Sequence, residues 1–281
     1  MKRKRRTILE KKQLVKKQFS RRANAYVDSK MHRKGKDLFQ LLEMAHTTGK
    51  EKLLDVATGG GHTANVFAPH VQEVVAMDLT PEMLQAAKNF IKENGHTNVT
   101  FVEGDAEKMP FPNSSFDIVT CRIAPHHFPH VEKFLQEVYR ILKPNGQFLL
   151  DDNVSPEDDE LDRFYNEMET IRDPSHIRAY KKSEWIKMIE LTGFVIDRFS
   201  RFNKKFEFKP WCERMNLSEK DQKKLTNFIV NSPEKVKRKF QIKVSHNQIE
   251  SFYGEALLLK AIKESNCYEG ITRNTRCRKQ F

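Results

Sequence analysis

A glycine-rich loop follows the first short apolar run of the sequence and reads Asp55-Val56-Ala57-Thr58-Gly59-Gly60-Gly61-His62-Thr63. Glycines let a ligand approach the backbone closely, and a helix that begins there presents free N–H groups. A dinucleotide fingerprint needs glycines at 57, 59 and 62, but only Gly59 fits, and the Lys-Ser/Thr pair of a P-loop is missing. The loop predicts a ligand site while giving little support to a pyrophosphate or a nucleoside triphosphate.

Two further carboxylates follow the next two apolar runs. Asp78 lies 23 residues beyond Asp55, where a carboxylate can accept hydrogen bonds from both ribose hydroxyls of a nucleoside. Asp105 follows the third run, where it can accept a hydrogen bond from an adenine amino group. In isolation, both residues would be ordinary turn formers. Because the glycine loop, Asp78 and Asp105 follow three successive strands, we predict a binding site for an adenosine group at the ends of these strands.

Two adjacent histidines, His126 and His127, lie in the loop after the fourth apolar run. Either could remove a proton from a phenol, thiol or enol, because an unperturbed imidazole has a pKa of ~6.5. Contacts to a cofactor or shaping of the substrate site remain open as alternatives. A zinc site that adds His130 is disfavoured, because Pro125 and Pro129 disrupt the helix that would aim the rings together. We predict no metal site.

The elements that must position these residues alternate between strands and helices. Predicted strands cover 53–57, 73–78, 99–105, 116–123 and 146–153, each short and rich in β-branched residues. Between them, a helix is predicted with Thr80 as N-cap, Pro81 in its first turn and Gly95 just past its end. This order is typical of an α/β, Rossmann-like, doubly wound and mostly parallel sheet, here with seven strands. Ligands then bind at the carboxyl ends of the strands.

The remaining segments complete a domain plan. We expect a basic head with cofactor-covering helices (1–45), a ligand-binding domain with an insertion at 155–180 (46–203), a helical lid insertion (204–254), a final strand (255–264) and a basic tail (265–281). The two insertions are expected to form walls of a substrate pocket. Arg172, His176, Arg178 and Trp211 are candidate wall residues.

Charge is divided unevenly along the 281 residues, which carry a net charge of +12. Residues 1–24 hold 11 Lys and Arg against one acid, residues 25–200 hold 20 against 28, and residues 201–281 hold 19 against nine. The predicted ligand loops thus lie in the acidic part of the chain. No apolar run approaches the ~18 residues of a membrane span. The four cysteines show no metal-binding or disulfide spacing, which favours a reducing cytoplasm.

Four motifs together resemble the class I S-adenosylmethionine-dependent methyltransferases. They are DVATGGGHT, AMDLTPEML, VEGDAEKMPFPNSSFDIVTCRIAPHHF and VYRILKPNGQFLLDD, and the resemblance covers about residues 19 to 200. More narrowly, the chain is similar to the ubiquinone/menaquinone biosynthesis methyltransferase-like group. One departure is Ala57, which stands where the common motif has its first glycine. We expect a negative φ there, so that alanine is tolerated.

The resemblance implies S-adenosylmethionine as cofactor and assigns residues to its methionine part. That part would lie over Ala57, Gly59 and Gly61, with Asp55 near its amino group. Arg122, which opens the histidine loop, is expected to contact the cofactor as well. The acidic charge of the middle region agrees in sign with a positive sulfonium.

Other residues are assigned by resemblance to the adenosine part. Asp78 would hold the ribose, and Leu79 would flank the adenine. Asp105 would hold the adenine amino group, with Ala106 beside the ring.

The segment QFSRRANAYVDSK resembles the N-terminal helix that covers the cofactor in related enzymes. Phe19 and Tyr26 are seven residues apart, hence on one helix face, and could shield the methyl group from water. Plain core packing of an amphipathic helix is an equally good interpretation.

These observations predict methyl transfer to a small-molecule acceptor by in-line displacement, in which proximity, alignment and a dry site matter most. The alternative is a nucleic-acid-binding protein, an RNA methyltransferase or a sensor of S-adenosylmethionine, that uses the basic flanks. The sequence lacks an Asn/Asp-Pro-Pro-Tyr-like motif after the fourth strand, and charge runs are more often solvated surface. The acceptor, the methylated atom and the oligomeric state stay open.

Overall fold

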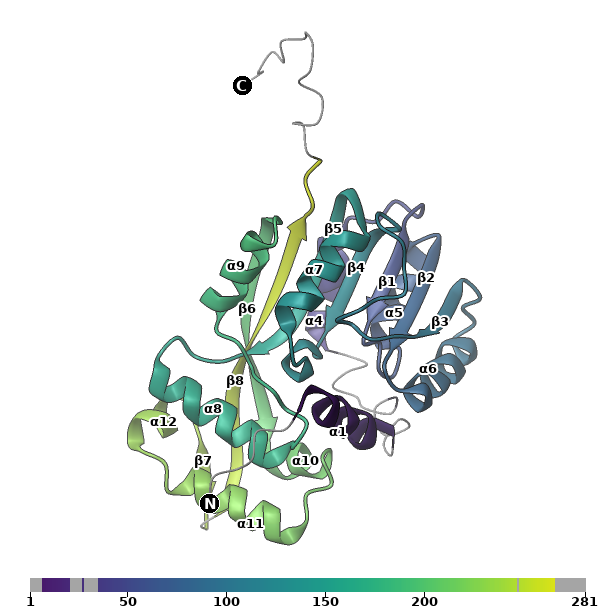
Figure 1. Ribbon diagram of the computed structural model, residues 1–281. Coiled ribbons are helices and arrows are strands. Elements are labelled where there is room, and N and C mark those ends of the chain that lie inside the picture. Colours follow the sequence, from purple (N-terminus) through teal and green to yellow (C-terminus); the bar gives the residue numbers. More distant parts are fainter. Residues whose placement is uncertain (1–6, 21–26, 28–34, 247, 266–281) are drawn as a thin grey trace, which may run out of the picture.

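A mixed β-sheet forms the centre of the computed structural model, which describes residues 7–20, 27, 35–246 and 248–265 (Figure 1). The strands are β1 (Lys52–Val56), β2 (Glu73–Asp78), β3 (Val99–Glu103), β4 (Phe116–Arg122), β5 (Leu142–Val154), β6 (Val195–Glu207), β7 (Lys243–Ser245) and β8 (Gln248–Ile262). Their order is β3-β2-β1-β4-β5-β8-β6, with β7 paired to β8. The first five strands are parallel, whereas β8 is antiparallel to β5 and to β6.

Helices connect the strands and cover both faces of the sheet. They are α1 (Ile8–Ser20), α4 (Lys36–Ala45), α5 (His62–Phe67), α6 (Pro81–Glu93), α7 (Val131–Ile141), α8 (Asp159–Arg172), α9 (Lys182–Leu191), α10 (Phe208–Glu213), α11 (Glu219–Val230) and α12 (Glu234–Lys239), with 3-10 turns η1 (Ala68–His70) and η2 (Pro125–His127). The predicted boundaries of α6 are confirmed: Thr80 is its extended N-cap residue and Pro81 opens it. Gly95, just past its end, has a positive φ of 82°.

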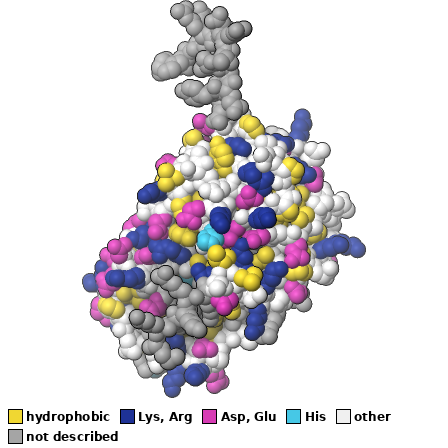
Figure 2. Space-filling model, viewed as in Figure 1, with side chains coloured by type: hydrophobic (Ala, Val, Ile, Leu, Met, Phe, Trp, Pro, Cys, Tyr) yellow, Lys and Arg dark blue, Asp and Glu magenta, His cyan; other side chains and the backbone are white. Residues whose placement is uncertain are grey.

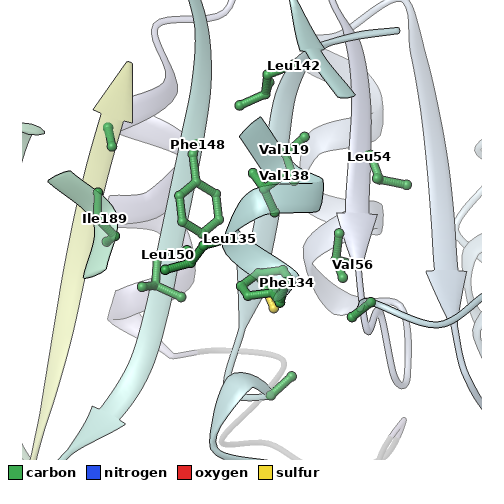
Figure 3. Close-up of a cluster of buried hydrophobic side chains, with 14 of the residues drawn as sticks. Leu54, Val56, Val119, Phe134, Leu135, Val138, Leu142, Phe148, Leu150 and Ile189 are labelled. Atoms are coloured by element: carbon green, nitrogen blue, oxygen red, sulfur yellow. The ribbon is translucent and has the colours of Figure 1, made fainter. Parts of the chain in front are cut away.

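Two buried clusters sandwich the sheet. On one face α7 and α9 pack against the strands, and Figure 3 shows Phe134 and Val138 of α7 facing Phe148 of β5. On the other face, α4, α5 and α6 bury Leu41, Phe67 and their neighbours against β1 and β2. This two-sided burial confirms the doubly wound architecture and makes the parallel strands a rigid support for the loops at their ends.

Strand register brings the predicted ligand residues to one edge of the sheet. Val56 of β1 pairs with Met77 of β2 and with Cys121 of β4. Asp78 of β2 pairs with Glu103 at the end of β3. The loops after all four strands therefore begin at the same level, as the sequence predicts.

A third cluster lies beyond this edge, where α8, α10, α11 and α12 pack around extensions of β6 and β8 (Figure 1). Ring contacts such as Phe206 with Phe252, at 5.1 Å between centroids, join the two strands there. The segment 204–254 is thus not wholly helical: β6 runs on to Glu207, and β8 begins at Gln248 rather than at 255. The short strand β7, which turns back onto β8, brings the sheet to eight strands among the described residues instead of seven.

Among the described residues, none of the helices combines the length and the hydropathy that a membrane crossing requires. On the face shown in Figure 2, basic and acidic side chains are interspersed rather than separated into patches of one sign.

Candidate functional site

The loop after β1 turns sharply through three residues with positive φ. Ala57 has φ 53°, Gly59 has φ 53° and Gly61 has φ 81°. The negative φ expected for Ala57 is therefore wrong: the turn needs the left-handed region, and alanine occupies it under strain. The turn is held by hydrogen bonds from the Thr58 N–H to the Met77 carbonyl, 2.9 Å, and from the Gly61 N–H to the Thr58 carbonyl, 2.9 Å.

The two glycines meet different surroundings. A Cβ on Gly61 would lie 2.9 Å from the Cβ of Ala87 on α6, so this glycine allows α5 and α6 to approach closely. A Cβ on Gly59 would meet nothing nearer than the Ala57 carbonyl oxygen, at 4.0 Å, because Gly59 borders a cavity. Gly61 does not line that cavity, so the structure gives it a packing position rather than the predicted ligand contact.

Asp55 is buried at the end of β1, with 1% of its surface exposed. It accepts hydrogen bonds from the hydroxyls of Thr58 (2.6 Å) and Thr120 (2.7 Å). Burial raises its pKa to about 6, although these bonds act in the opposite direction. The side chain lines the cavity in a fixed orientation.

Asp78 fixes the glycine loop to the end of β2. Its two oxygens accept from the Gly59 N–H, 2.9 Å, and from the Thr80 N–H, 2.9 Å. Burial raises the pKa of Asp78, and the two backbone donors oppose that rise. The Thr80 side chain and the Leu79 backbone act in the same direction.

The acidic residues after β3 meet a lysine from α1. The Lys12 ammonium lies 2.6 Å from Asp105 and 2.7 Å from Glu107. Lys16, one turn further along α1, pairs with Glu103 at 3.2 Å. Helix α1 is thereby fastened over the edge of the sheet, and Asp105 is already engaged by a cation.

Arg122, at the end of β4, is enclosed by carboxylates. Its Nε lies 3.0 Å from Asp37 of α4 and 3.1 Å from Asp151 of β5. Burial raises the pKa of Asp151 to about 7. Burial also disfavours the charged form of Asp37, but Arg122, a hydrogen bond with Asp151 and the charge of Lys204 together outweigh it and lower the pKa of Asp37 to about 2. The guanidinium lines the cavity, and these two acids fix its position.

The two histidines of η2 point to different partners. The His126 Nδ1 lies 2.6 Å from Asp152 of β5, and His126 does not line the cavity. The His127 ring does line it and meets the edge of the Phe19 ring of α1, 5.1 Å between centroids. Of the two predicted bases, only His127 is therefore in position to meet a ligand. The His130 N–H donates to Glu107, at 2.7 Å.

The cavity collects most of the residues that the sequence singles out. Its lining includes Phe19, Asp55, Ala57, Gly59, Asp78, Leu79, Asp105, Ala106, Arg122 and His127. Gly61 and His126 lie outside it, and Tyr26 falls outside the described residues. Sequence reasoning missed the lining residues Lys12, Val15, Met83 and Glu107, of which only Glu107, two residues after Asp105, carries a local signal.

None of the four candidate wall residues from the insertions lines this cavity. Trp211 is buried in the third cluster, which α8, α10, α11 and α12 form. The Arg172 guanidinium lies over the Trp211 ring, 4.5 Å from its centroid. Arg178 pairs with Asp162 and Glu184, and His176 contacts Asn166 at 3.0 Å. These side chains stabilise the two insertions, because helices that pack away from the main sheet need a buried core and ion pairs of their own.

Comparison with known proteins agrees with this geometry. Residues 54–150 match the family model described as methyltransferase domain. YcgJ of Bacillus subtilis (strain 168), an uncharacterized methyltransferase, is 38% identical over 246 residues, which covers 87% of this chain and 97% of YcgJ. A ubiquinone/menaquinone biosynthesis C-methyltransferase, UbiE of Ectopseudomonas mendocina (strain ymp), is 33% identical over 129 residues, 44% of this chain and 50% of UbiE.

A solved structure shows the same fold. The crystal structure of BH2331 from Bacillus halodurans C-125, described as a candidate methyltransferase, superimposes with a TM-score of 0.81 at 50% sequence identity. It covers 82% of this chain and the whole of that one. The chain therefore belongs to the class I S-adenosylmethionine-dependent methyltransferases, and its cofactor is S-adenosylmethionine.

Proposed function

We propose that this enzyme methylates a small-molecule acceptor with S-adenosylmethionine held in the cavity between α1 and the loops after β1, β2, β3 and β4. The observation that carries the proposal is the convergence of Asp55, Asp78 and Asp105 on one cavity that also borders Gly59. Three carboxylates at consecutive strand ends match a ligand that presents hydrogen-bond donors along its length.

The lining residues fit S-adenosylmethionine by their chemistry. The cofactor carries an ammonium group, two ribose hydroxyls and an adenine amino group, all of which donate hydrogen bonds. We assign Asp55 to the ammonium, Asp78 to the ribose and Asp105 to the adenine, with Leu79 and Ala106 beside the ring. The open space over Gly59 lets the methionine part pass close to the backbone.

The chain's own groups then position and shield the reaction. When bound, S-adenosylmethionine supplies an electrophilic methyl group on a sulfonium. Phe19 and Val15 of α1 close the cavity with apolar surface, which excludes water from the transfer. Arg122, held by Asp37 and Asp151, gives a fixed positive charge for a carboxylate of the ligand.

His127 is the group that we assign to proton removal. Burial and the neighbouring His126 lower its pKa to about 4, so the ring is neutral near pH 7 and carries a free lone pair, with a basicity below that of an unperturbed imidazole. The neighbouring His126 is held by Asp152. Burial opposes the charged form of His126, but the Asp152 carboxylate outweighs this effect and raises the pKa of His126.

The nucleic-acid alternative gains no support from the described basic residues near the site. Lys12 and Lys16 of α1 point at acidic residues of the same chain. Both charge signs are mixed on the face of Figure 2, whereas a track for nucleic acid needs clustered cations. We therefore favour the small acceptor, with the cytoplasmic location that the cysteine spacing favours.

Calorimetric titration tests the cofactor site. S-adenosylmethionine should bind saturably to the wild-type chain, and NAD should not bind. Asp78→Ala should weaken binding by about tenfold to a hundredfold, because hydrogen bonds to a charged group contribute ~1.5–3 kcal/mol. Glu103→Ala is the matched control, since Glu103 ends the adjacent strand without lining the cavity. NAD binding, or equal effects of the two substitutions, would contradict the assignment.

A second titration series tests the nature of the acceptor. Activity on a compact acceptor that is insensitive to salt supports the proposal. RNA binding with an affinity that falls steeply as salt rises would support the nucleic-acid alternative instead.

A further inference from the structure

A groove of about 690 Å³ lies between α1, the last turn of α8 and the segment that leads from α10 into α11. Its volume falls within the range of ~300–1,000 Å³ that is usual for sites of small molecules. Its described lining residues share none with the lining of the cofactor cavity. The groove is therefore a second hollow of the molecule, separate from the place that we assign to S-adenosylmethionine.

Helix α1 is a wall of both hollows. Its residues Lys12, Val15 and Phe19 lie on one face, at the spacing of successive helical turns, and line the cofactor cavity. Lys11 and Gln18 are seven residues apart, hence on one neighbouring face, and line the groove. A molecule in the groove and a cofactor in the cavity would therefore contact the same helix.

The groove presents positive charge from two sides. Lys11 of α1 and Lys224 of α11 both line it, and neither ammonium pairs with a carboxylate of the described residues. Asp221 is the acidic residue among its described lining, and its Oδ2 already accepts a hydrogen bond from the Ser218 hydroxyl, at 2.7 Å. Two lysines are thus available to an anion, and one partly satisfied acid opposes them.

Apolar surface lies beside these charges. Ile171, Met215 and Leu217 line the groove, and Ile171 and Leu217 also pack against the third cluster. Arg172, one of the predicted wall residues, lines the groove as well, and Glu169 holds its guanidinium at 3.0 Å. The lining therefore suits a molecule that has an apolar body and an acidic group.

We propose that the groove binds a small organic anion, an apolar chain that bears a carboxylate or a phosphate, and that this anion strengthens cofactor binding by holding α1 in place. The anion is neither the cofactor nor the methyl acceptor, so the inference goes beyond the proposed function. Its acidic oxygens accept hydrogen bonds from Lys11 and Lys224, and its chain covers Ile171 and Leu217.

The effect on the cofactor follows from the shared helix. Both molecules contact α1 in the position in which Val15 and Phe19 close the cavity. A ligand that favours this position of the helix makes it more available to the other ligand, and the coupling between two binding sites is reciprocal. This step rests on the proposed placement of the cofactor.

Calorimetry on the full chain tests the groove. The protein is first saturated with S-adenosylhomocysteine, which occupies the cofactor cavity, and is then titrated with octanoate, octyl phosphate or 1-octanol. We expect at least one of the two anions to bind about tenfold or more tightly than the alcohol, because two lysines contact its acidic group. In the reverse order, the anion should raise the affinity for S-adenosylhomocysteine about fivefold or more.

Four substitutions locate the site. Lys11→Met and Lys224→Met each remove one charge and keep the apolar stem. Each should weaken anion binding by about threefold to fivefold, the size expected for one partly exposed charge contact. Lys17→Met on α1 and Lys223→Met on α11 are the matched controls, because neither lysine lines the groove, and both should leave anion binding unchanged.

Three results would overturn the inference: anions that bind no more tightly than the alcohol, equal effects of the four substitutions, or an affinity for S-adenosylhomocysteine that the anion leaves unchanged. Failure of S-adenosylhomocysteine to bind at all would instead overturn the proposed cofactor site. In that case, titration of the ligand-free chain and of Lys11→Met with the same anions still tests the groove.

Discussion

The ammonium of Lys12 lies 2.6 Å from a carboxylate oxygen of Asp105, the residue that we assign to the adenine amino group. A cofactor that binds there must share or displace this contact. Partly exposed ion pairs contribute up to ~1 kcal/mol, which corresponds to about fivefold in affinity. We therefore expect Lys12→Met, which keeps the apolar stem, to tighten S-adenosylmethionine binding by up to about fivefold in calorimetry.

Lys16→Met is the control for this experiment. Lys16 lies on the same helix and pairs with Glu103, but neither residue lines the cavity. Its removal should change the affinity less than twofold, an order-of-magnitude bound for an exposed pair. Weaker binding in Lys12→Met would show that the lysine holds α1 closed over the cofactor and does not compete with it.

The contact between Lys12 and Asp105 could not be predicted from the sequence, whereas the common position of the three aspartates could. Asp55, Asp78 and Asp105 follow apolar runs of strand length, so their common edge follows from local patterns and the rules of parallel sheets. Lys12 pairs with a residue 93 positions away, and the docking of α1 depends on tertiary packing that no local pattern encodes. Ala57 is a second example, because its residue type does not reveal the positive φ of 53°.

The acids around Arg122 should differ in their effect on stability. Asp37 is ionised beside the guanidinium, so Asp37→Asn leaves a buried charge poorly paired and should cost ~3–5 kcal/mol in urea unfolding. Asp151 has a folded pKa of about 7, so Asp151→Asn resembles the protonated acid and should cost less than ~1 kcal/mol at pH 5. Similar losses in the two variants at pH 5 would contradict this division of charge.

The pH dependence follows from the same two carboxyls. The raised pKa of Asp151 contributes stability that is fully present below its unfolded value, ~3.9, and is lost as pH rises through about 7. Wild type should therefore lose stability relative to Asp151→Asn over that window. The pKa of Asp37, lowered to about 2, contributes stability that is present above ~3.9 and lost as pH falls through about 2.

The site residues that sequence reasoning missed on β5 have a related cause. Asp151 and Asp152 end a run that reads as an ordinary buried strand, and nothing local indicates that they meet Arg122 and His126. The loop histidines were recognisable as a pair, but which of them faces the ligand depends on Asp152, a partner 26 residues away.

The histidine pair should show opposite pKa changes when Asp152 is replaced. His126 is faced by Asp152, Glu169 and Asp173, and His127 by His126, Asp173 and Asp152. Asp152→Asn removes the main group that keeps His126 charged, so the pKa of His126 should fall. His127 then loses a neighbouring positive charge, and its pKa should rise from about 4.

Histidine nitrogen chemical shifts, followed by NMR through a pH titration, measure both changes. In the wild type near pH 5.5, His127 should be neutral with its proton on Nδ1 while His126 is doubly protonated. Parallel shifts of the two rings in Asp152→Asn would refute the coupling. The lowered pKa of His127 also means that wild-type stability falls as pH drops from ~6.5 toward about 4.

The glycines of the β1 loop should separate stability from binding. Gly61→Ala combines a φ of 81° with a Cβ 2.9 Å from that of Ala87, and backbone as well as side chain stands in the way. Strain of ~1–2 kcal/mol and overpacking of ~1–3 kcal/mol should lower the free energy of unfolding. Gly59→Ala should lower the free energy of unfolding only through backbone strain, because its Cβ enters open space. The same Cβ takes up space that the ligand needs, so this variant should weaken S-adenosylmethionine binding by about tenfold or more. Urea unfolding and calorimetry on both variants check this, and a binding loss without a stability loss in Gly61→Ala would overturn the assignment of Gly61 to packing.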